Sequence, residues 1–165
     1  MATDEKEQST FELPAAQPEH RWLSQWIGDW RTEGSDEGEP TWTERVRPIG
    51  DIWIQCEGTG AMPGTDVPAT TILTVGFDPK TRRFVGSWIG SMMNHHWVYD
   101  GELDTEGRIL TLYSEGPSFT GADGLQSYKD VFEVESPDLR VLRAYVKGED
   151  GAWSHFMTTT YRRIG

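Results

Sequence analysis

Ten short runs of β-forming residues, each ended by a turn signal, follow one another along this chain of 165 residues. Valine, isoleucine, threonine and aromatic residues fill the runs, whereas glycine, proline, aspartate and serine separate them. Short loops of this kind join neighbouring antiparallel strands, so the expected order is a meander. The strands are predicted at residues 29–34, 41–48, 51–58, 69–77, 82–90, 95–103, 108–115, 126–135, 139–147 and 152–162.

Closure of the sheet is the simplest way to accommodate so many strands, because a flat sheet would leave two exposed edges. We therefore predict an all-β fold, an antiparallel up-and-down barrel of about ten strands, with a two-sheet sandwich as the alternative. In one strand Phe84 and Trp88 point to one face while Val85 and Ile89 point to the other. Apolar residues on both faces fit a partly covered outer surface or a homodimer interface.

A single short helix is predicted ahead of the strands, at Pro18–Ile27. Proline suits the first helical turn, and Gly28 stands where a C-terminal cap belongs. His20 is expected to be exposed. Residues 1–17 are polar and acidic and are predicted to form a mobile tail, which leaves 18–165 as one barrel domain. The apolar stripe of the helix consists of Trp22, Leu23, Trp26 and Ile27.

The charge balance excludes several classes of partner. A formal net charge of −12 would repel nucleic acids and anionic membrane surfaces. The chain contains no run of ~18 apolar residues that would span a bilayer, and its first residues lack the pattern of a secretory signal. Its single cysteine, Cys56, cannot form an intrachain disulfide. These features indicate a cytoplasmic protein, with Cys56 acting as a small core residue.

Aromatic residues make up 12% of the chain, including eight tryptophans spread over the helix and many strands. Because a barrel of eight or more strands can hold a small ligand, rings that face inward would line its pocket. The leading functional hypothesis is therefore binding of a small hydrophobic or aromatic ligand. Strict alternation along each strand is assumed, and one β-bulge would exchange the two faces. The predicted ligand-binding residues are Trp53, Trp88, Trp97, Tyr128, Trp153 and His155.

Two other hypotheses use the same strands. In the first, the barrel is an enzyme in which His155 or Asp130 acts as an acid or base, although no residue is assigned as catalytic. Asp130 shares a strand face with Tyr128 and Phe132, and His155 shares one with Trp153. In the second, the barrel self-associates through its outer face without a ligand. An enzymatic role is the less favoured reading.

Metal binding is not expected. His95 and His96 are adjacent at the start of a strand, so their side chains point to opposite faces and cannot chelate one ion as a pair. The sequence supplies no zinc-binding spacing of histidine or cysteine elsewhere.

Several short segments in their order resemble the bacterial family known as domain of unknown function 1579. The resemblance runs from about residue 18 to the C-terminus, and it implies a calycin-like or lipocalin-like barrel without implying an activity. The segments are LSQWIGDW (23–30), TVGFD (74–78), FVGSWIGSM (84–92), SEGPSFTG (114–121) and the closing Tyr161-Arg162-Arg163.

The triplet Gly28-Asp29-Trp30 is similar to the Gly-x-Trp start of lipocalin-type barrels, which implies that Trp30 closes the base of the barrel. The run from Gly28 to Gly34 is also similar to the signature of nitrobindin-type haem barrels, from which it departs at Asp29 and Thr32. We expect no cofactor; the alternative implied by that similarity is a haem ligated by His155.

Overall fold

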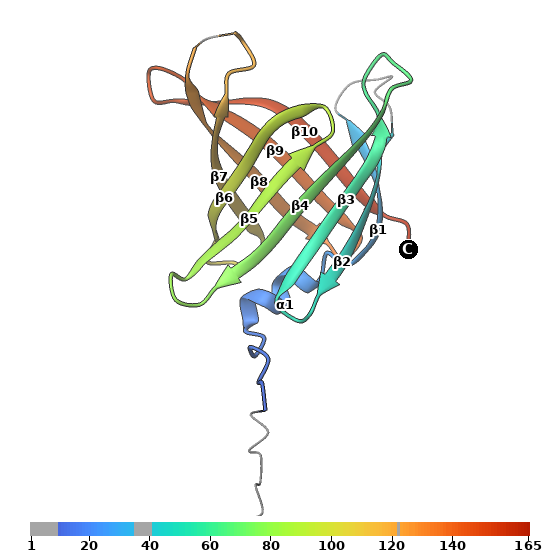
Figure 1. Ribbon diagram of the computed structural model, residues 1–165, viewed down its shortest axis with the longest axis vertical. Helices are drawn as coiled ribbons and strands as arrows, with labels where there is room; N and C mark the ends of the chain where they lie inside the picture. Colours follow the sequence, from blue (N-terminus) through green and yellow to red (C-terminus); the bar gives the residue numbers. More distant parts are fainter. Residues whose placement is uncertain (1–9, 35–40, 122) are drawn as a thin grey trace, which may run out of the picture.

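A computed structural model, which describes residues 10–34, 41–121 and 123–165, shows ten antiparallel strands closed into one barrel (Figure 1). Each strand pairs with the next along the chain, and β1 pairs with both β2 and β10. The predicted all-β meander is confirmed. The elements are α1 (Pro18–Ser24), β1 (Gly28–Gly34), β2 (Thr43–Ile49), β3 (Trp53–Ala61), β4 (Pro68–Asp78), β5 (Arg83–Gly90), β6 (Met93–Leu103), β7 (Ile109–Pro117), β8 (Leu125–Ser136), β9 (Leu139–Lys147) and β10 (Trp153–Arg163).

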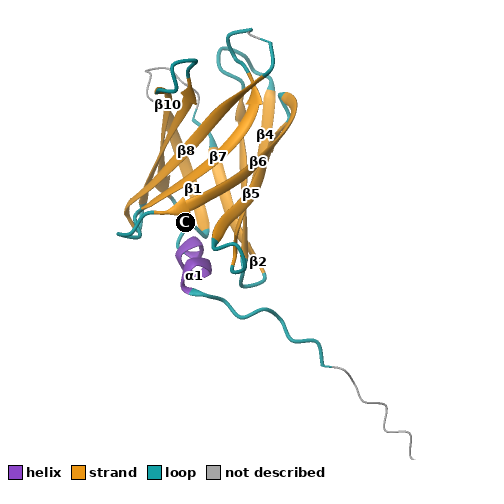
Figure 2. Ribbon diagram, turned by 90° about the vertical axis from the view of Figure 1, so that its left-hand side faces the viewer, coloured by secondary structure: helices purple, strands orange, loops and turns teal. Residues whose placement is uncertain are grey.

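The predicted tail falls partly outside the described residues, which begin at residue 10. Residues 10–17 form neither helix nor strand and extend away from the barrel (Figure 2). Within the described residues, no helix has the length and hydropathy of a membrane span. The division into a tail and one barrel domain stays a prediction.

Helix α1 covers one end of the barrel (Figure 2). It ends at Ser24, three residues before the predicted end, and a turn then carries the chain into β1. Leu23 and Trp26 are almost fully buried, and the Trp26 ring packs 5.0 Å from the ring of Phe132 on β8. The apolar stripe thus forms a plug that fills this end of the barrel.

His20 is buried, so the expectation that it is exposed is wrong. Its Nδ1 accepts a hydrogen bond from the backbone N–H of Gln17 (2.9 Å), and its Nε2 donates to the carbonyl of Phe77 on β4 (3.0 Å). Because the short helix lies across the barrel end, a residue beside the apolar stripe also meets a strand. Both ring nitrogens are satisfied there, which makes His20 a link between α1 and the sheet.

Trp30 closes the base of the barrel, as the resemblance to lipocalins implies. Its side chain is buried, and its indole N–H donates to the carbonyl of Trp26 (2.8 Å). The guanidinium of Arg163 lies 4.3 Å from the Trp30 ring and donates to the carbonyls of Ile27 (2.6 Å) and Gln25 (2.7 Å). Arg163, at the end of β10, therefore fixes the segment that leads into β1.

A buried ion pair lies just above this plug. Arg140 on β9 donates to the carboxylate of Glu44 on β2, and the arginine is 1% exposed. The guanidinium also lies over three aromatic rings, those of Trp26 (4.5 Å), Trp30 (4.7 Å) and Tyr161 (4.2 Å). Opposite charges cancel here, so the pair makes an electrically neutral floor for the space above it.

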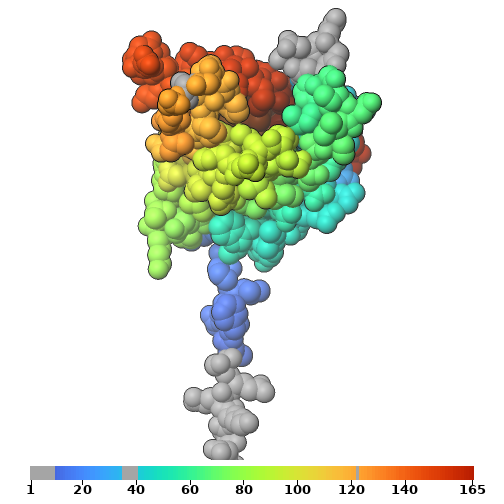
Figure 3. Space-filling model, turned by 45° about the horizontal axis from the view of Figure 1, so that its top comes forward, coloured from blue at the N-terminus to red at the C-terminus, as the bar shows by residue number. Residues whose placement is uncertain are grey.

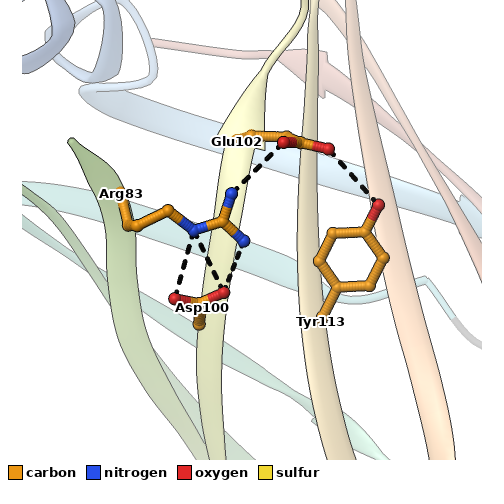
Figure 4. A network of polar contacts seen from close by, with 4 residues as sticks. All are labelled: Arg83, Asp100, Glu102 and Tyr113. Atoms are coloured by element: carbon orange, nitrogen blue, oxygen red, sulfur yellow. Dashed lines mark hydrogen bonds and ion pairs between the residues drawn. The ribbon is translucent and has the colours of Figure 1, made fainter. Parts of the chain in front are cut away.

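A polar network crosses the outer face of β5, β6 and β7 (Figure 4). Arg83 donates from Nε to both Asp100 oxygens (3.2 Å each) and from Nη1 to Glu102 (3.2 Å), to which the hydroxyl of Tyr113 also donates (3.5 Å). The hydrogen bonds from Arg83 hold the pKa of Asp100 below its usual value. The network lies where the β6–β7 ladder ends, at the pair Asp100 and Tyr113.

Candidate functional site

A cavity of about 250 Å³ occupies the barrel above the buried ion pair. It lies toward the end opposite α1, which Figure 3 brings forward. Its walls are mostly apolar and aromatic, with a few polar groups among them. A second space of about 330 Å³ continues it toward β1 and β2 and shares Glu44, Trp88 and Tyr161 with it. The first cavity is lined by Glu44, Cys56, Thr71, Leu73, Trp88, Met93, Trp97, Tyr99, Ser114, Phe119, Tyr128, Asp130, Phe132, Leu142, Ala144, Phe156, Met157 and Tyr161.

Aromatic rings from β6, β8 and the β7–β8 loop form one wall of the cavity. The rings of Trp97 and Tyr128 meet edge to face at 5.1 Å, and Phe119 stacks over Trp97 at 6.2 Å. The Trp97 ring lies against Gly116 on β7, where any Cβ atom would overlap it. The glycine thus allows a large flat ring to lie against the neighbouring strand. Phe119 is 64% exposed, so it marks the mouth.

The structure brings three of the six predicted ligand-binding residues together. Trp88, Trp97 and Tyr128 all line the cavity. Trp53 lies on the outer face instead, where it is 38% exposed and covers Gly76 of β4. Its strand neighbours Ile54 and Cys56 show the inward alternation, since both are buried.

Trp153 and His155 also lie outside the barrel, because β10 contains a bulge. His155 pairs with Tyr145 while Met157 pairs with Ala144, so Phe156 is an extra residue. Beyond the bulge Met157 faces the cavity, but before it the alternation is reversed. The His155 ring is exposed, donates to or accepts from the hydroxyl of Thr158 (2.7 Å), and packs on Tyr145 at 5.5 Å.

Because His155 lies outside the barrel, it cannot act as a haem ligand or as an acid or base in the cavity. A haem held in the cavity would find no ligand in this side chain, so His155 does not fit the role that the haem alternative gives it. His95 binds the carbonyl of Glu115 (2.9 Å) and its neighbour His96 is exposed, as their opposite faces predict. In the described part of the chain, histidine, cysteine and carboxylate groups form no cluster of three that would hold a metal ion.

Asp130 on β8 is the polar centre of the cavity. The hydroxyl of Tyr99 on β6 donates to its Oδ2 at 2.6 Å, and the described residues give the carboxyl no ion-pair partner. Burial raises the pKa of Asp130 to about 6, although the Tyr99 hydrogen bond favours the charged form. Burial and this carboxyl likewise raise the pKa of Tyr99. Asp130 is thus a carboxyl group inside an aromatic cavity that changes from its neutral to its charged form near pH 6.

This raised pKa has a consequence for stability. Because folded Asp130 has a pKa above the ~3.9 of an unfolded aspartate, its favourable contribution is complete below pH ~4 and is lost as the pH rises through about 6. Replacing Asp130 with asparagine removes that loss and keeps an acceptor for Tyr99. We expect the Asp130→Asn variant to be more stable than the parent by about 2 kcal/mol at pH 7.5, and equally stable at pH 4.

Thermal unfolding at the two pH values measures this difference. The matched control is Asp51→Asn, which removes one negative charge at an exposed turn. A stabilisation of both variants to the same extent would show that net charge, rather than the buried carboxyl, is responsible.

Several lining residues are not among those predicted from the sequence, for different physical reasons. Tyr99 is two residues from Trp97 and shares its face, so strand alternation could have found it. Phe119 lies in a loop, where no periodicity applies. Phe156 faces inward only through the bulge, and Ala144 carries no aromatic or polar signal.

Together, the closed meander, the helical plug and the open upper interior define a lipocalin-like β-barrel with an internal cavity. The chain belongs to the family described as "Protein of unknown function (DUF1579)", whose model matches residues 15–163. The family resemblance seen in the sequence is thereby confirmed. No curated protein matches the chain by sequence.

Solved structures share the architecture at low sequence identity. The S-type phycobiliprotein lyase CPES from Guillardia theta is 14% identical, with a TM-score of 0.51 over 88% of this chain and 92% of that one. EF1p2_mFAP2b bound to DFHBI is 15% identical, with a TM-score of 0.45 over 88% and 99% of the two chains. A de novo designed fluorescence-activating β-barrel is 13% identical, with a TM-score of 0.45 over 86% and 95%. At such identities the likeness concerns the fold alone.

Proposed function

We propose that this protein binds a small molecule with an aromatic or apolar body inside the barrel. The observation that carries the proposal is the contrast between the two halves of the interior. The lower half is filled by the side chains of the plug, whereas the upper half leaves a cavity of about 250 Å³. This volume is close to the lower end of ligand pockets, about 300 Å³.

The lining of the cavity supports the same conclusion. Trp88, Trp97 and Tyr128 supply flat apolar surface, and the Asp130–Tyr99 pair supplies a fixed polar contact. Ligand pockets combine these two features, since apolar walls give affinity and a few polar groups set orientation. A barrel with a purely structural role would gain stability by filling this space with side chains.

Filling the cavity tests the proposal. Ala144 on β9 is buried and lines the cavity between its paired residues Asp130 on β8 and Met157 on β10, so phenylalanine there would project into the space. We expect the Ala144→Phe variant to bind 3-ethylindole, a neutral aromatic probe, at least about tenfold more weakly than the parent, or about 1.4 kcal/mol. Isothermal titration calorimetry measures the affinity.

The control is Ala152→Phe, the same substitution at an exposed turn before β10, which should leave the affinity unchanged. Native mass spectrometry of freshly purified protein complements it by looking for a co-purified small molecule. Binding of the probe with equal affinity to the parent and to Ala144→Phe would overturn the proposed site.

Acid–base catalysis in the same cavity is the second candidate function, and Asp130 is the observation that favours it. Its pKa of about 6 lets the carboxyl accept or release a proton near neutral pH. A molecule that co-purifies with Asp130→Asn and that the parent then converts would support this role over binding alone. Cytoplasmic location, bacterial origin and a homodimer through the outer face stay predictions.

A further inference from the structure

We propose that the ligand carries a protonated amine, or an equivalent cationic nitrogen, next to its aromatic body, and that Asp130 is the group that binds it. This proposal rests on the proposed binding function and names its ligand class. A ligand of this kind would place its ring against Trp97 and Tyr128 and its ammonium group at the carboxyl.

The first support is an uncompensated charge. The cavity wall contains two carboxyl groups, and Arg140 neutralises that of Glu44. Asp130 has a neutral hydroxyl as its partner instead, and none of the described residues lining the cavity is lysine or arginine. Asp130 is half-buried among aromatic rings, where a carboxylate is costly unless it is paired, so a cationic ligand would supply the missing partner.

The second support is the aromatic surroundings of this carboxyl. Tyr128 and Phe132 flank Asp130 on the same face of β8, and Trp97 lies edge to face with Tyr128 at 5.1 Å. The faces of aromatic rings attract cations, and cages of rings with a carboxylate are a recurring way to recognise ammonium groups. A neutral ligand would use the rings but leave the charge of Asp130 unpaired.

The third support is the charge of the whole chain. A net charge of −12 attracts cations toward the protein and repels anions. The neutral Glu44–Arg140 floor adds no net charge to the cavity. Other ionisable groups that face the cavity are Cys56, Tyr99, Tyr128 and Tyr161, and burial raises the pKa of Tyr161 and of the Cys56 thiol, which keeps both neutral at pH 7.

Three probes that share one indole ring separate charge from shape. Tryptamine is cationic, 3-ethylindole is neutral and indole-3-propionate is anionic. By calorimetry at pH 7.5 we expect tryptamine to bind at least about tenfold more tightly than 3-ethylindole, with the anion weakest. In Asp130→Asn the ratio of the tryptamine affinity to the 3-ethylindole affinity should fall to about one, whatever the variant does to the two affinities together. Asp51→Asn, which removes one negative charge as Asp130→Asn does, should keep the parent's preference.

The pH provides a second measurement on the parent protein. An alkylamine stays protonated well above neutral pH, as lysine does. Protonation of Asp130 below about pH 6 should therefore weaken tryptamine about tenfold between pH 7.5 and pH 5, with no matching change for 3-ethylindole. Circular dichroism and thermal unfolding confirm that each variant is folded.

The outcomes distinguish the two proposals. If 3-ethylindole binds and tryptamine binds no better, the cavity is a ligand site but the cationic class is wrong. If Asp130→Asn still prefers tryptamine, the carboxyl of Asp130 is not the group that binds the ammonium group, and the inference is overturned. If none of the three probes binds the parent, the proposed binding function fails with it.

Discussion

An Arg140→Met variant is expected to lose about 3–5 kcal/mol of stability, the largest effect predicted for this protein. Methionine keeps the unbranched apolar stem of the arginine as far as the position of its Nε, so part of the packing against the surrounding rings is retained. The substitution leaves the Glu44 carboxylate in the barrel interior, where it is 9% exposed, without its cation. An uncompensated charge at such a position is strongly destabilising. Urea unfolding followed by tryptophan fluorescence measures the change.

The double variant Glu44→Gln/Arg140→Met separates the loss of the pair from the loss of the arginine. With both charges removed, most of the stability should return, because a buried ion pair and its neutral replacement often have similar free energies. A double variant as unstable as Arg140→Met would instead assign the effect to the cation–π contacts with Trp26, Trp30 and Tyr161.

Replacing Gly86 with alanine is expected to destabilise the barrel by about 3 kcal/mol. A Cβ atom at this position of β5 would overlap the carbonyl oxygen of Thr74 on the paired strand β4. Backbone cannot move aside as the end of a side chain can, so the β4–β5 ladder must open locally. Gly101 on β6 meets the carbonyl of Thr111 in the same way. These glycines allow the wall to bend sharply as it closes.

Gly165→Ala is the control for this prediction. A Cβ atom there would lie 3.5 Å from the Asp29 side chain, an ordinary contact. Its midpoint of thermal unfolding should match that of the parent, whereas that of Gly86→Ala should fall by several degrees. Equal stability of Gly86→Ala and the parent would contradict the close approach of β4 and β5.

Local patterns predicted the order of elements well, because turns and alternation act over a few residues. The turn residues separate strands whose bounds lie within a few residues of the predicted ones. Alternation placed Tyr128 and Asp130 on the same inward face of β8, and the structure brings both to the cavity. The helical stripe likewise packs into the barrel end, although the helix is shorter than predicted.

Alternation of side chains gave the wrong face in two situations. In one, a bulge adds a residue to the strand; in the other, the sequence does not show which of the two faces points inward. In β10 the extra residue Phe156 reverses the faces, which moves His155 and Trp153 outside. In β3 the strand is regular, but an aromatic residue such as Trp53 can cover a glycine of the next strand from outside as readily as it can line a cavity. Propensity alone does not distinguish these two surfaces, since both are apolar and partly covered.

The sequence by itself determined the class of fold, since closely spaced strands and turns leave a closed sheet as the arrangement without exposed edges. It also showed that aromatic residues are spread over the helix and many strands. Tertiary structure alone decided that Arg140 meets Glu44, 96 positions earlier in the chain, while Asp130 meets the neutral hydroxyl of Tyr99. The physical reason is that charge compensation depends on distances across the closed barrel, which no local pattern contains.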